Sequence, residues 1–216
     1  MVKTNEAGEF NKYETRGAYH WEWYETNTFG YRDLVDLAMK HIPDEKGATI
    51  LDVGCGDGFT SFKLYQKGLK VVGIDTSAEG IRLAREKTDS IRWLQPPWLQ
   101  FTGKIGVNFK KLLRYRQGDL RFRVQSIYDL DPNERYDYVL CQDVIEHVKY
   151  PELLIEKVFN TMRKSAIIST PNAKFTNPRQ YDYFVWTPEE FLALFGNKNV
   201  EIVHCDHGKI YAKMWK

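Results

Sequence analysis

The stretch ILDVGCGDGF, residues 50–59, constrains the fold more than any other, because three glycines alternate directly after an apolar run. These are Gly54, Gly56 and Gly58. Glycine adopts backbone conformations that other residues avoid, and it lets the main chain approach a ligand closely. We therefore expect a buried strand that ends in a tight loop, with the backbone of that loop in contact with a ligand.

Strand-like and helix-like stretches alternate around this loop. The expected order is strand 49–53, helix 60–67, strand 69–74, helix 77–87, strand 122–127, strand 136–140, a helix from about residue 151 and strand 166–170. Alternation of this kind is typical of a parallel sheet covered by helices. The expected fold class is therefore α/β.

The C-terminal part carries a helix signal and a turn signal. The segment TPEE, residues 187–190, combines a capping threonine, a proline at the first helical position and a glutamate three residues after the cap. This pattern predicts a helix that runs to about residue 195. The strand-like runs 200–205 and 209–214 are separated only by a short turn-like segment, so we expect them to pair as antiparallel strands.

Length and composition bound the domain organisation. The chain has 216 residues, of which 43% are hydrophobic, and this is suited to one well-buried domain rather than two. We expect a single domain over residues 1–216 with an aromatic-rich N-terminal cap over about 1–30. We also expect a lid-like insertion over about 88–118, because that stretch is long and contains a pair of prolines that preclude a regular element.

Several classes of protein are disfavoured by what the sequence lacks. No apolar run approaches the roughly 20 residues that a membrane span needs, and the first residues lack the apolar stretch of a signal peptide. We therefore expect a cytoplasmic protein without a membrane partner. The cysteines, Cys55, Cys141 and Cys205, are odd in number and lack paired spacing, which argues against a disulfide framework or a zinc site.

Charge is distributed unevenly, although the formal net charge is only +2. Residues 89–123 hold eight basic side chains and two acidic ones. Such a block is either a solvated face or a surface that binds an anion such as RNA. Both interpretations stay open on these residues alone.

The glycine loop does not match a dinucleotide site. A dinucleotide fingerprint has its third glycine at the position where this chain has Phe59. Asp52 precedes the loop instead, and Asp75 closes the next apolar run. A carboxylate at the end of that strand suits a ribose diol, because it accepts the hydrogens of both hydroxyl groups. The pattern therefore indicates a ligand that contains a nucleoside.

These residues resemble motifs I and II of the class I S-adenosylmethionine-dependent methyltransferases, and the resemblance covers most of the chain from about residue 49. It implies a Rossmann-like, seven-stranded, mostly parallel sheet with helices on both faces and a final antiparallel strand. It also implies S-adenosyl-L-methionine as the cofactor. The residues that it places at the cofactor are Asp52, Gly54, Cys55, Gly56, Gly58, Asp75, Ser126, Ile127 and Cys141.

The resemblance implies that different residues of this set contact different parts of the cofactor. The backbone of residues 54–56 faces the methionine part, and Asp75 binds the ribose. Ser126 stands where many relatives have an acid that receives the adenine amino group, which leaves the backbone and side chain of Ile127 for that contact. Cys141 is expected beside the methionine part, or as a small buried residue.

The stretch CQDVIEHV, residues 141–148, follows the fourth expected strand, and open α/β sheets bind ligands at the carboxyl ends of their strands. Asp143, Glu146 and His147 flank its apolar pair and converge over the cofactor sulfonium if the turn is helical. His147 is then the candidate general base, since a histidine with a pKa near about 6.5 is largely neutral at neutral pH. The alternative is a histidine that only ties down the loop.

This stretch, with STPNAKF and YFVWTPEEF downstream, is similar to two subgroups of the family. One comprises the O-methyltransferases of quinone biosynthesis and related small-molecule enzymes, and the other comprises the small-RNA 3′-terminal 2′-O-methyltransferases. In the RNA subgroup two acids, a histidine and a later histidine hold a divalent metal, and Asp143, Glu146 and His147 match the first three. Residues 173–185 contain no later histidine and offer only Asp182 or Tyr183, so we expect no metal.

The function expected from these features is transfer of a methyl group from S-adenosyl-L-methionine to an oxygen or nitrogen of a small molecule, such as a sugar or a natural-product precursor. An RNA methyltransferase is the alternative, because of the basic residues in 89–123. A protein that binds the cofactor without catalysis is the alternative from a different class.

Overall fold

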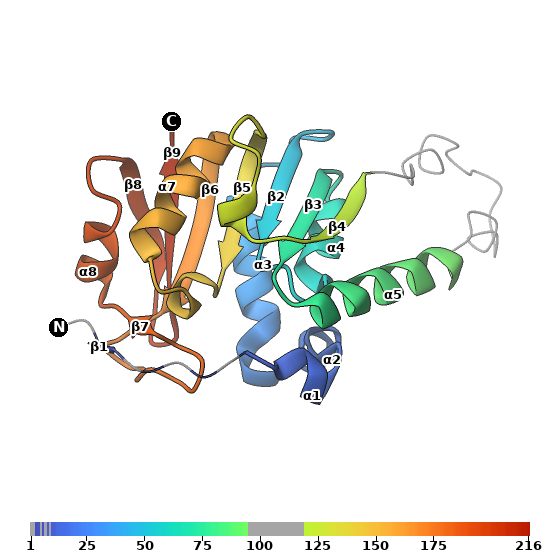
Figure 1. The fold of residues 1–216 in the computed structure, drawn as a ribbon, viewed down its shortest axis with the longest axis horizontal. Helices are drawn as coiled ribbons and strands as arrows, with labels where there is room; N and C mark the ends of the chain where they lie inside the picture. The colour runs from blue at the N-terminus through green and yellow to red at the C-terminus, as the bar shows by residue number, and fades with distance from the viewer. Residues whose placement is uncertain (1–2, 5, 7, 9, 95–118) are drawn as a thin grey trace.

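The computed structural model describes residues 3–4, 6, 8, 10–94 and 119–216, and its main feature is a seven-stranded sheet in the order β4-β3-β2-β5-β6-β9-β8 (Figure 1). The strands of this sheet are β2 (Thr49–Val53), β3 (Lys70–Asp75), β4 (Leu120–Val124), β5 (Tyr136–Gln142), β6 (Met162–Pro171), β8 (Asn199–Cys205) and β9 (Lys209–Trp215). A separate pair joins β1 (Lys3–Thr4) to β7 (Phe184–Val185).

Helices connect most of these strands. They are α1 (Lys12–Arg16), α2 (Tyr19–Thr26), α3 (Tyr31–His41), α4 (Phe59–Gln66), α5 (Ala78–Leu94), α7 (Pro151–Thr161) and α8 (Pro188–Ala193), with short 3-10 turns η1 (Thr28–Gly30), η2 (Ile127–Asp129) and η3 (Ile145–His147). Within the described ranges, no helix combines the length and the apolar character that crossing a bilayer requires.

The strand directions confirm the expected fold class. Strands β4, β3, β2, β5 and β6 run parallel to one another, whereas β9 pairs antiparallel with both β6 and β8. The connection between β8 and β9 is the short turn expected from the sequence. The result is a Rossmann-like, mostly parallel sheet whose last strand is antiparallel.

Apolar side chains cover both faces of the sheet, as alternation along its central strands requires. On β2, Leu51 and Val53 pack with residues of α7 and α8, whereas Ile50, which precedes them, packs with residues of α3 and α4. In Figure 1, α7 lies on the near face of the sheet. Helices therefore bury the sheet from both sides, and the carboxyl ends of its parallel strands stay available for a site.

Helix α5 is longer than expected. It continues to Leu94, so the prediction of an irregular stretch from residue 88 was wrong over residues 88–94. The reason is that its buried stripe of Ile81 and Ala84 continues to Thr88, whose hydroxyl donates a hydrogen bond to the Ala84 carbonyl at 2.7 Å. The rest of the predicted insertion, residues 95–118, lies outside the described residues.

The predicted start of the last helix is confirmed in detail. Thr187 accepts a hydrogen bond from the Glu190 backbone N–H at 3.3 Å, and the Glu190 carboxylate accepts one from the Thr187 N–H at 3.0 Å. This capping box satisfies two of the free N–H groups at the helix end. It fixes the direction of the chain that enters α8 from β7.

The three glycines of the loop after β2 all have left-handed backbones, with φ of 70° at Gly54, 52° at Gly56 and 78° at Gly58. A Cβ atom at Gly58 would lie 2.7 Å from the Ala84 Cβ, and Cβ atoms at Gly54 and Gly56 would overlap other side chains of this protein. Glycine is therefore required here both by the backbone conformation and by packing. Packing inside the protein is thus a second reason for these glycines, beside the close approach of a ligand that the sequence predicts.

We expect Gly58→Ala to lower the free energy of unfolding by about 2–4 kcal/mol, because it adds overpacking against α5 to the strain of a left-handed alanine. Gly196→Ala is the matched control, since Gly196 has φ of 60° but no atom within 4 Å of the place that a Cβ would take. It should cost about 1 kcal/mol. Urea unfolding measures both values, and equal losses would contradict the packing argument.

Candidate functional site

The register of the parallel strands brings three polar segments to one edge of the sheet. Strand β2 pairs with β3 on one side and with β5 on the other, all in the same direction. The glycine loop follows β2, Asp75 ends β3, and Asp143 follows β5. The carboxyl ends of parallel strands are where open α/β sheets bind their ligands. The candidate site is therefore the edge shared by these three segments.

Asp75 is held by the backbone on both sides. One carboxylate oxygen accepts a hydrogen bond from the Gly56 N–H at 2.8 Å, and the other accepts one from the Ser77 N–H at 2.8 Å. Burial raises the pKa of Asp75 above its ordinary value, although both N–H groups oppose this. Each oxygen keeps a further lone pair for an incoming hydroxyl. The structure thus presents a fixed carboxylate that fits a ribose diol.

The N-terminal helices lie against the glycine loop. Asp57 of the loop is fully buried, and its carboxylate accepts a hydrogen bond from the His20 N–H at 2.9 Å, while its carbonyl accepts one from the Trp21 indole at 3.0 Å. The hydroxyl of Tyr13 occupies the space in front of Gly56. These contacts put α1 and α2 over the loop, at the place where the sequence predicts a cap.

Several predicted cofactor residues turn their side chains into the protein interior. The Asp52 carboxylate accepts a hydrogen bond from the Ser61 hydroxyl, and burial raises the pKa of Asp52 to about 7. Cys55 packs with apolar residues of α5 and β4, and Cys141 is fully buried in the main core. Cys55 therefore contributes its backbone to the loop, while its side chain lies in the core. The side chains of Asp52, Cys55 and Cys141 pack beneath the edge of the sheet and do not line the surface of the candidate site.

The predicted adenine contacts also have internal roles. Ser126 caps the turn η2, because its hydroxyl accepts a hydrogen bond from the Tyr128 N–H at 3.2 Å. Ile127 is buried and packs in the main core. Gly58 packs against α5, as described above. The structure therefore brings Gly54, Gly56 and Asp75 together, with the other predicted cofactor residues behind them.

The turn after β5 is fixed by its first residue. Asp143 has φ of 55°, and its N–H donates a hydrogen bond to the Ser169 hydroxyl at 3.1 Å, which in turn donates to the Asp143 carboxylate at 2.9 Å. The other carboxylate oxygen forms an ion pair with Lys209. Burial alone would raise the pKa of Asp143, but Lys209 pulls it below its ordinary value. Asp143 is thus an ionised anchor for the turn.

His147 follows on the 3-10 turn η3, and its ring is oriented by two acceptors. The Nδ1 atom lies 2.8 Å from the Tyr181 carbonyl and 3.2 Å from the Asp182 carboxylate. Burial lowers the pKa of His147, but Asp182, Glu146 and the Tyr181 carbonyl outweigh it and raise the pKa. Because Nδ1 donates to these acceptors, Nε2 is left as the basic nitrogen, and it has no hydrogen-bond partner among the described residues.

Glu146 is the most buried acid of the turn. It is 2% exposed, and its Oε2 atom has no hydrogen-bond partner in the described part of the chain. Burial and the negative charge of Asp143 raise the pKa of Glu146 to about 7. Its backbone carbonyl accepts a hydrogen bond from the Tyr183 N–H at 2.7 Å. Glu146 and His147 thus lie on the short helical turn η3 and Asp143 precedes it, whereas their convergence over the cofactor sulfonium stays a prediction.

Two residues of this site were missed by sequence reasoning, and one was considered in another role. Ser169 and Lys209 come from β6 and β9, and no local pattern marks either of them. Asp182 was considered only as a metal ligand, whereas here it is 2% exposed and orients His147. Their proximity to the end of β5 depends on the order of the strands in the sheet, and no local stretch of sequence gives that order.

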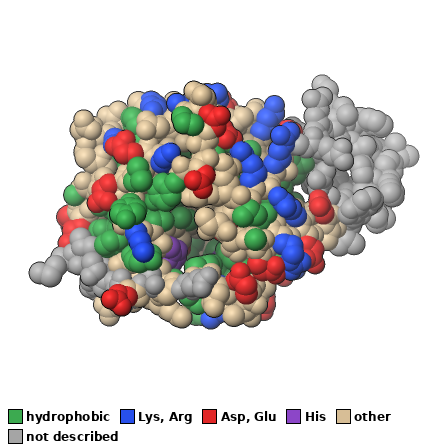
Figure 2. Space-filling view, viewed as in Figure 1, with side chains coloured by type: hydrophobic (Ala, Val, Ile, Leu, Met, Phe, Trp, Pro, Cys, Tyr) green, Lys and Arg blue, Asp and Glu red, His purple; other side chains and the backbone are tan. Residues whose placement is uncertain are grey.

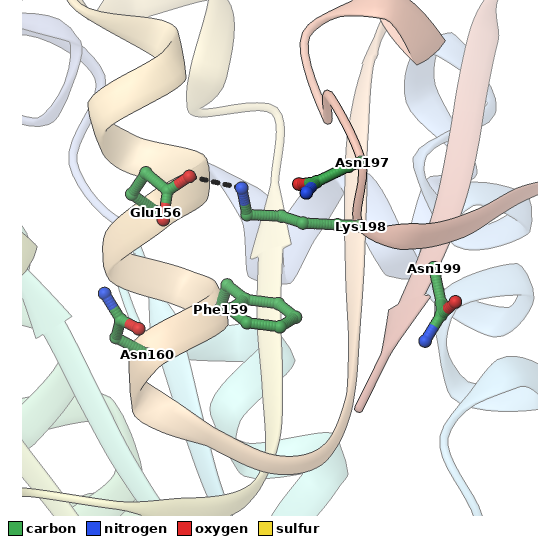
Figure 3. A pocket seen from close by; sticks show the side chains of 6 residues that line it. All are labelled: Glu156, Phe159, Asn160, Asn197, Lys198 and Asn199. Atoms are coloured by element: carbon green, nitrogen blue, oxygen red, sulfur yellow. Dashed lines mark hydrogen bonds and ion pairs between the residues drawn. The ribbon is translucent and has the colours of Figure 1, made fainter.

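A hollow of about 380 Å³ lies elsewhere on the protein, between α7 and the start of β8 (Figure 3). Across it, Lys198 forms an ion pair with Glu156. Residues at this end of α7 lead into the amino end of β6, which is the opposite edge of the sheet from the glycine loop. The hollow is therefore not part of the candidate site.

Comparison with known proteins gives the family. A family model described as "Methyltransferase domain" matches residues 24–201. The mitochondrial ubiquinone biosynthesis O-methyltransferase of Dictyostelium discoideum is 30% identical over 149 residues, which are 67% of this chain and 41% of that protein. The chain thus spans less than half the length of that relative.

Solved structures show the same fold. The small RNA methyltransferase HEN1 has a TM-score of 0.66 at 21% identity, over 86% of this chain and 25% of that one. The N-terminal domain of EvdMO1 with SAH bound has a TM-score of 0.58 at 16% identity, over 85% and 81% of the two chains. With the family match over most of the chain, these findings show that the protein belongs to the methyltransferase domain family and is an S-adenosylmethionine-dependent methyltransferase.

Proposed function

We propose that the protein methylates a hydroxyl oxygen or an amine nitrogen of a small molecule, such as a sugar or a natural-product precursor, with His147 as the general base. The observation that carries this proposal is the pairing of His147 Nδ1 with the Tyr181 carbonyl and Asp182, which leaves Nε2 to accept a proton. The name of the Dictyostelium relative, an O-methyltransferase, favours oxygen as the acceptor atom.

The residues at the sheet edge fit the cofactor. In the proposed arrangement the ribose hydroxyls donate to Asp75, whose two oxygens are already aligned by the N–H groups of Gly56 and Ser77. The backbone of residues 54–56 faces the methionine part. Tyr13 of α1 lies against Gly56, so the N-terminal helices form one wall of the proposed cofactor site.

The cofactor supplies an electrophilic methyl group on a sulfonium, and the protein supplies alignment, a dry environment and a proton acceptor. In the proposed reaction, the acceptor oxygen or nitrogen would bond to the methyl carbon as the carbon–sulfur bond breaks, S-adenosylhomocysteine would leave, and His147 Nε2 would take the acceptor proton. Asp182 stabilises the imidazolium that forms, as a carboxylate does in other histidine-dependent enzymes. Glu146 lies on the same turn, and Asp143 keeps that turn in place.

RNA as the acceptor is the alternative, and the described residues give it less support. Lys and Arg side chains gather near the β4 edge of the sheet (Figure 2). However, Arg123 of β4 is engaged by Glu134 and by the Tyr136 hydroxyl. The basic residues of the predicted insertion from 104 to 116 lie outside the described ranges.

The two acceptor classes are separated by a methyl-transfer screen with radiolabelled cofactor. We expect label in a small-metabolite extract and not in total RNA, with little difference between low and high salt. An RNA enzyme would lose affinity steeply with salt, with a log–log slope of about −0.7 per phosphate contact on single strands. Label that enters RNA at low salt and disappears at high salt would contradict the small-molecule proposal.

The ribose contact is tested by calorimetry with S-adenosylhomocysteine. Asp75→Ala should weaken binding by about 1.5–3 kcal/mol, because charge-assisted hydrogen bonds are lost. Asp44→Ala, which removes an exposed carboxylate far from the loop, is the control and should leave affinity unchanged. Wild-type protein should not bind NAD. An Asp75→Ala variant of full affinity would exclude the proposed role of this residue.

Once an acceptor is known, His147→Gln should lower kcat by about 10²- to 10⁴-fold with little change in cofactor affinity. Asp182→Asn keeps the base but removes the anion that raises the pKa of His147. Activity requires neutral His147, so the acid limb of the pH profile should move to lower pH in this variant. A His147→Gln enzyme of full speed, or an unmoved acid limb, would refute the base assignment.

A further inference from the structure

The turn after β5 and the chain segment beside it place three carboxyl groups around one imidazole. We call Asp143, Glu146 and Asp182 the acidic cluster. All three surround His147, and both Glu146 and Asp182 are 2% exposed. Burying carboxyl groups in such proximity is unfavourable unless a cation is near. The question is which cation this protein uses.

On the Asp143 side, that cation is Lys209. Its ammonium forms an ion pair with Asp143, and its side chain is 10% exposed against 31% for that of Asp143. A lysine this well buried has lost most of its hydration, and the ion pair compensates for that loss. Lys209 also acts on Glu146, where its charge opposes the effect of burial. One ammonium thus serves two of the three carboxyl groups.

The hairpin between β8 and β9 holds Lys209 in position. The Lys209 N–H donates a hydrogen bond to the Asp206 carboxylate at 2.8 Å, and the Lys209 carbonyl accepts one from the Asp206 N–H at 3.0 Å. The Asn172 amide donates to the Asp206 carbonyl at 2.7 Å. In the sheet, Lys209 stands opposite Pro171 of β6. The stem of the side chain therefore starts from a fixed backbone beside the cluster.

A divalent metal, which the RNA subgroup holds at the matching positions, does not fit this arrangement. Both oxygens of Asp143 are engaged, one by Ser169 and one by Lys209. Both oxygens of Asp182 are engaged as well, one by His147 Nδ1 and one by the Arg179 N–H. Among the residues that the structure describes, no group of three or more His, Cys, Asp or Glu side chains is arranged to hold a metal ion. An ammonium in contact with Asp143 would also repel a divalent ion there.

We propose that the Lys209 ammonium is the resident cation of the acidic cluster and that it keeps divalent metal ions out of this site. Lys209 is a positioning residue, because it acts on the turn that carries Glu146 and His147 through Asp143. The inference concerns the site of the proposed function, but it makes a claim about cation binding that needs no methyl acceptor.

The test is a Mn²⁺ titration followed by electron paramagnetic resonance, on protein first stripped with chelator. Wild type, Lys209→Arg and the control Lys213→Gln, a lysine of the same strand, should show no stoichiometric site. Lys209→Gln removes the charge but keeps a polar side chain, and it should bind one Mn²⁺ at least about tenfold more tightly than wild type. Circular dichroism checks that each variant is folded.

Two results would overturn the proposal: wild-type protein that binds one equivalent of Mn²⁺ tightly, or folded Lys209→Gln that binds Mn²⁺ no better than wild type. If Lys209→Gln is too unstable to titrate, its thermal melting with and without Mn²⁺ reports the same event, because an ion that binds only the folded state raises Tm. No increase in Tm would then count against the proposal. Binding of S-adenosylhomocysteine, measured in parallel, tests the cofactor site separately.

Discussion

The site depends on the junction between the glycine loop and β3. The N–H groups of Gly54 and Cys55 both donate hydrogen bonds to the Ile74 carbonyl, and the next N–H, from Gly56, donates to Asp75. The loop is therefore closed onto the end of the neighbouring strand, and it can follow that path only with left-handed glycines. This closure places the carboxylate at the loop and leaves room for the N-terminal helices above it.

The second half of the candidate site, the turn after β5, is held in place by charged and polar contacts. The segment after β5 lies at the carboxyl edge of the parallel strands, and there carboxyl groups of this segment and of Asp182 surround one imidazole. The arrangement is stable because the partners come from the following strands: Ser169 from β6 and Lys209 from β9. A methyl transfer that needs mainly alignment and a proton acceptor can work in such a setting. The hairpin at the C-terminal end is thus part of the site as well as of the sheet.

The sequence predicted those features that short stretches encode. The glycine loop and the capping box before α8 are local patterns, and the structure shows both at the expected residues. Helix α5 was predicted too short, because the two prolines at residues 96–97 drew the expected break back to residue 88. The assignment of the cofactor residues, the single domain and the cytoplasmic location stay predictions.

What could not be predicted are contacts between residues that are distant in sequence. Lys209 is an ordinary lysine after a turn until β9 inserts between β6 and β8, and only then does its ammonium reach Asp143. Asp182 stands in a segment without regular structure that is held beside the turn by the hydrogen bond from Tyr183 to Glu146. No local periodicity carries this information.

The N-terminal segment touches both halves of the site. Its first strand, β1, pairs with β7 just after Asp182, the Gly8 N–H donates to the Gln180 carbonyl at 2.8 Å, and α2 is fastened to Asp57 of the glycine loop. The described parts of this segment thus contact both halves of the candidate site, namely the chain around Asp182 and the glycine loop. A substitution that disturbs the packing of this segment at one half of the site therefore also acts on the chain that contacts the other half.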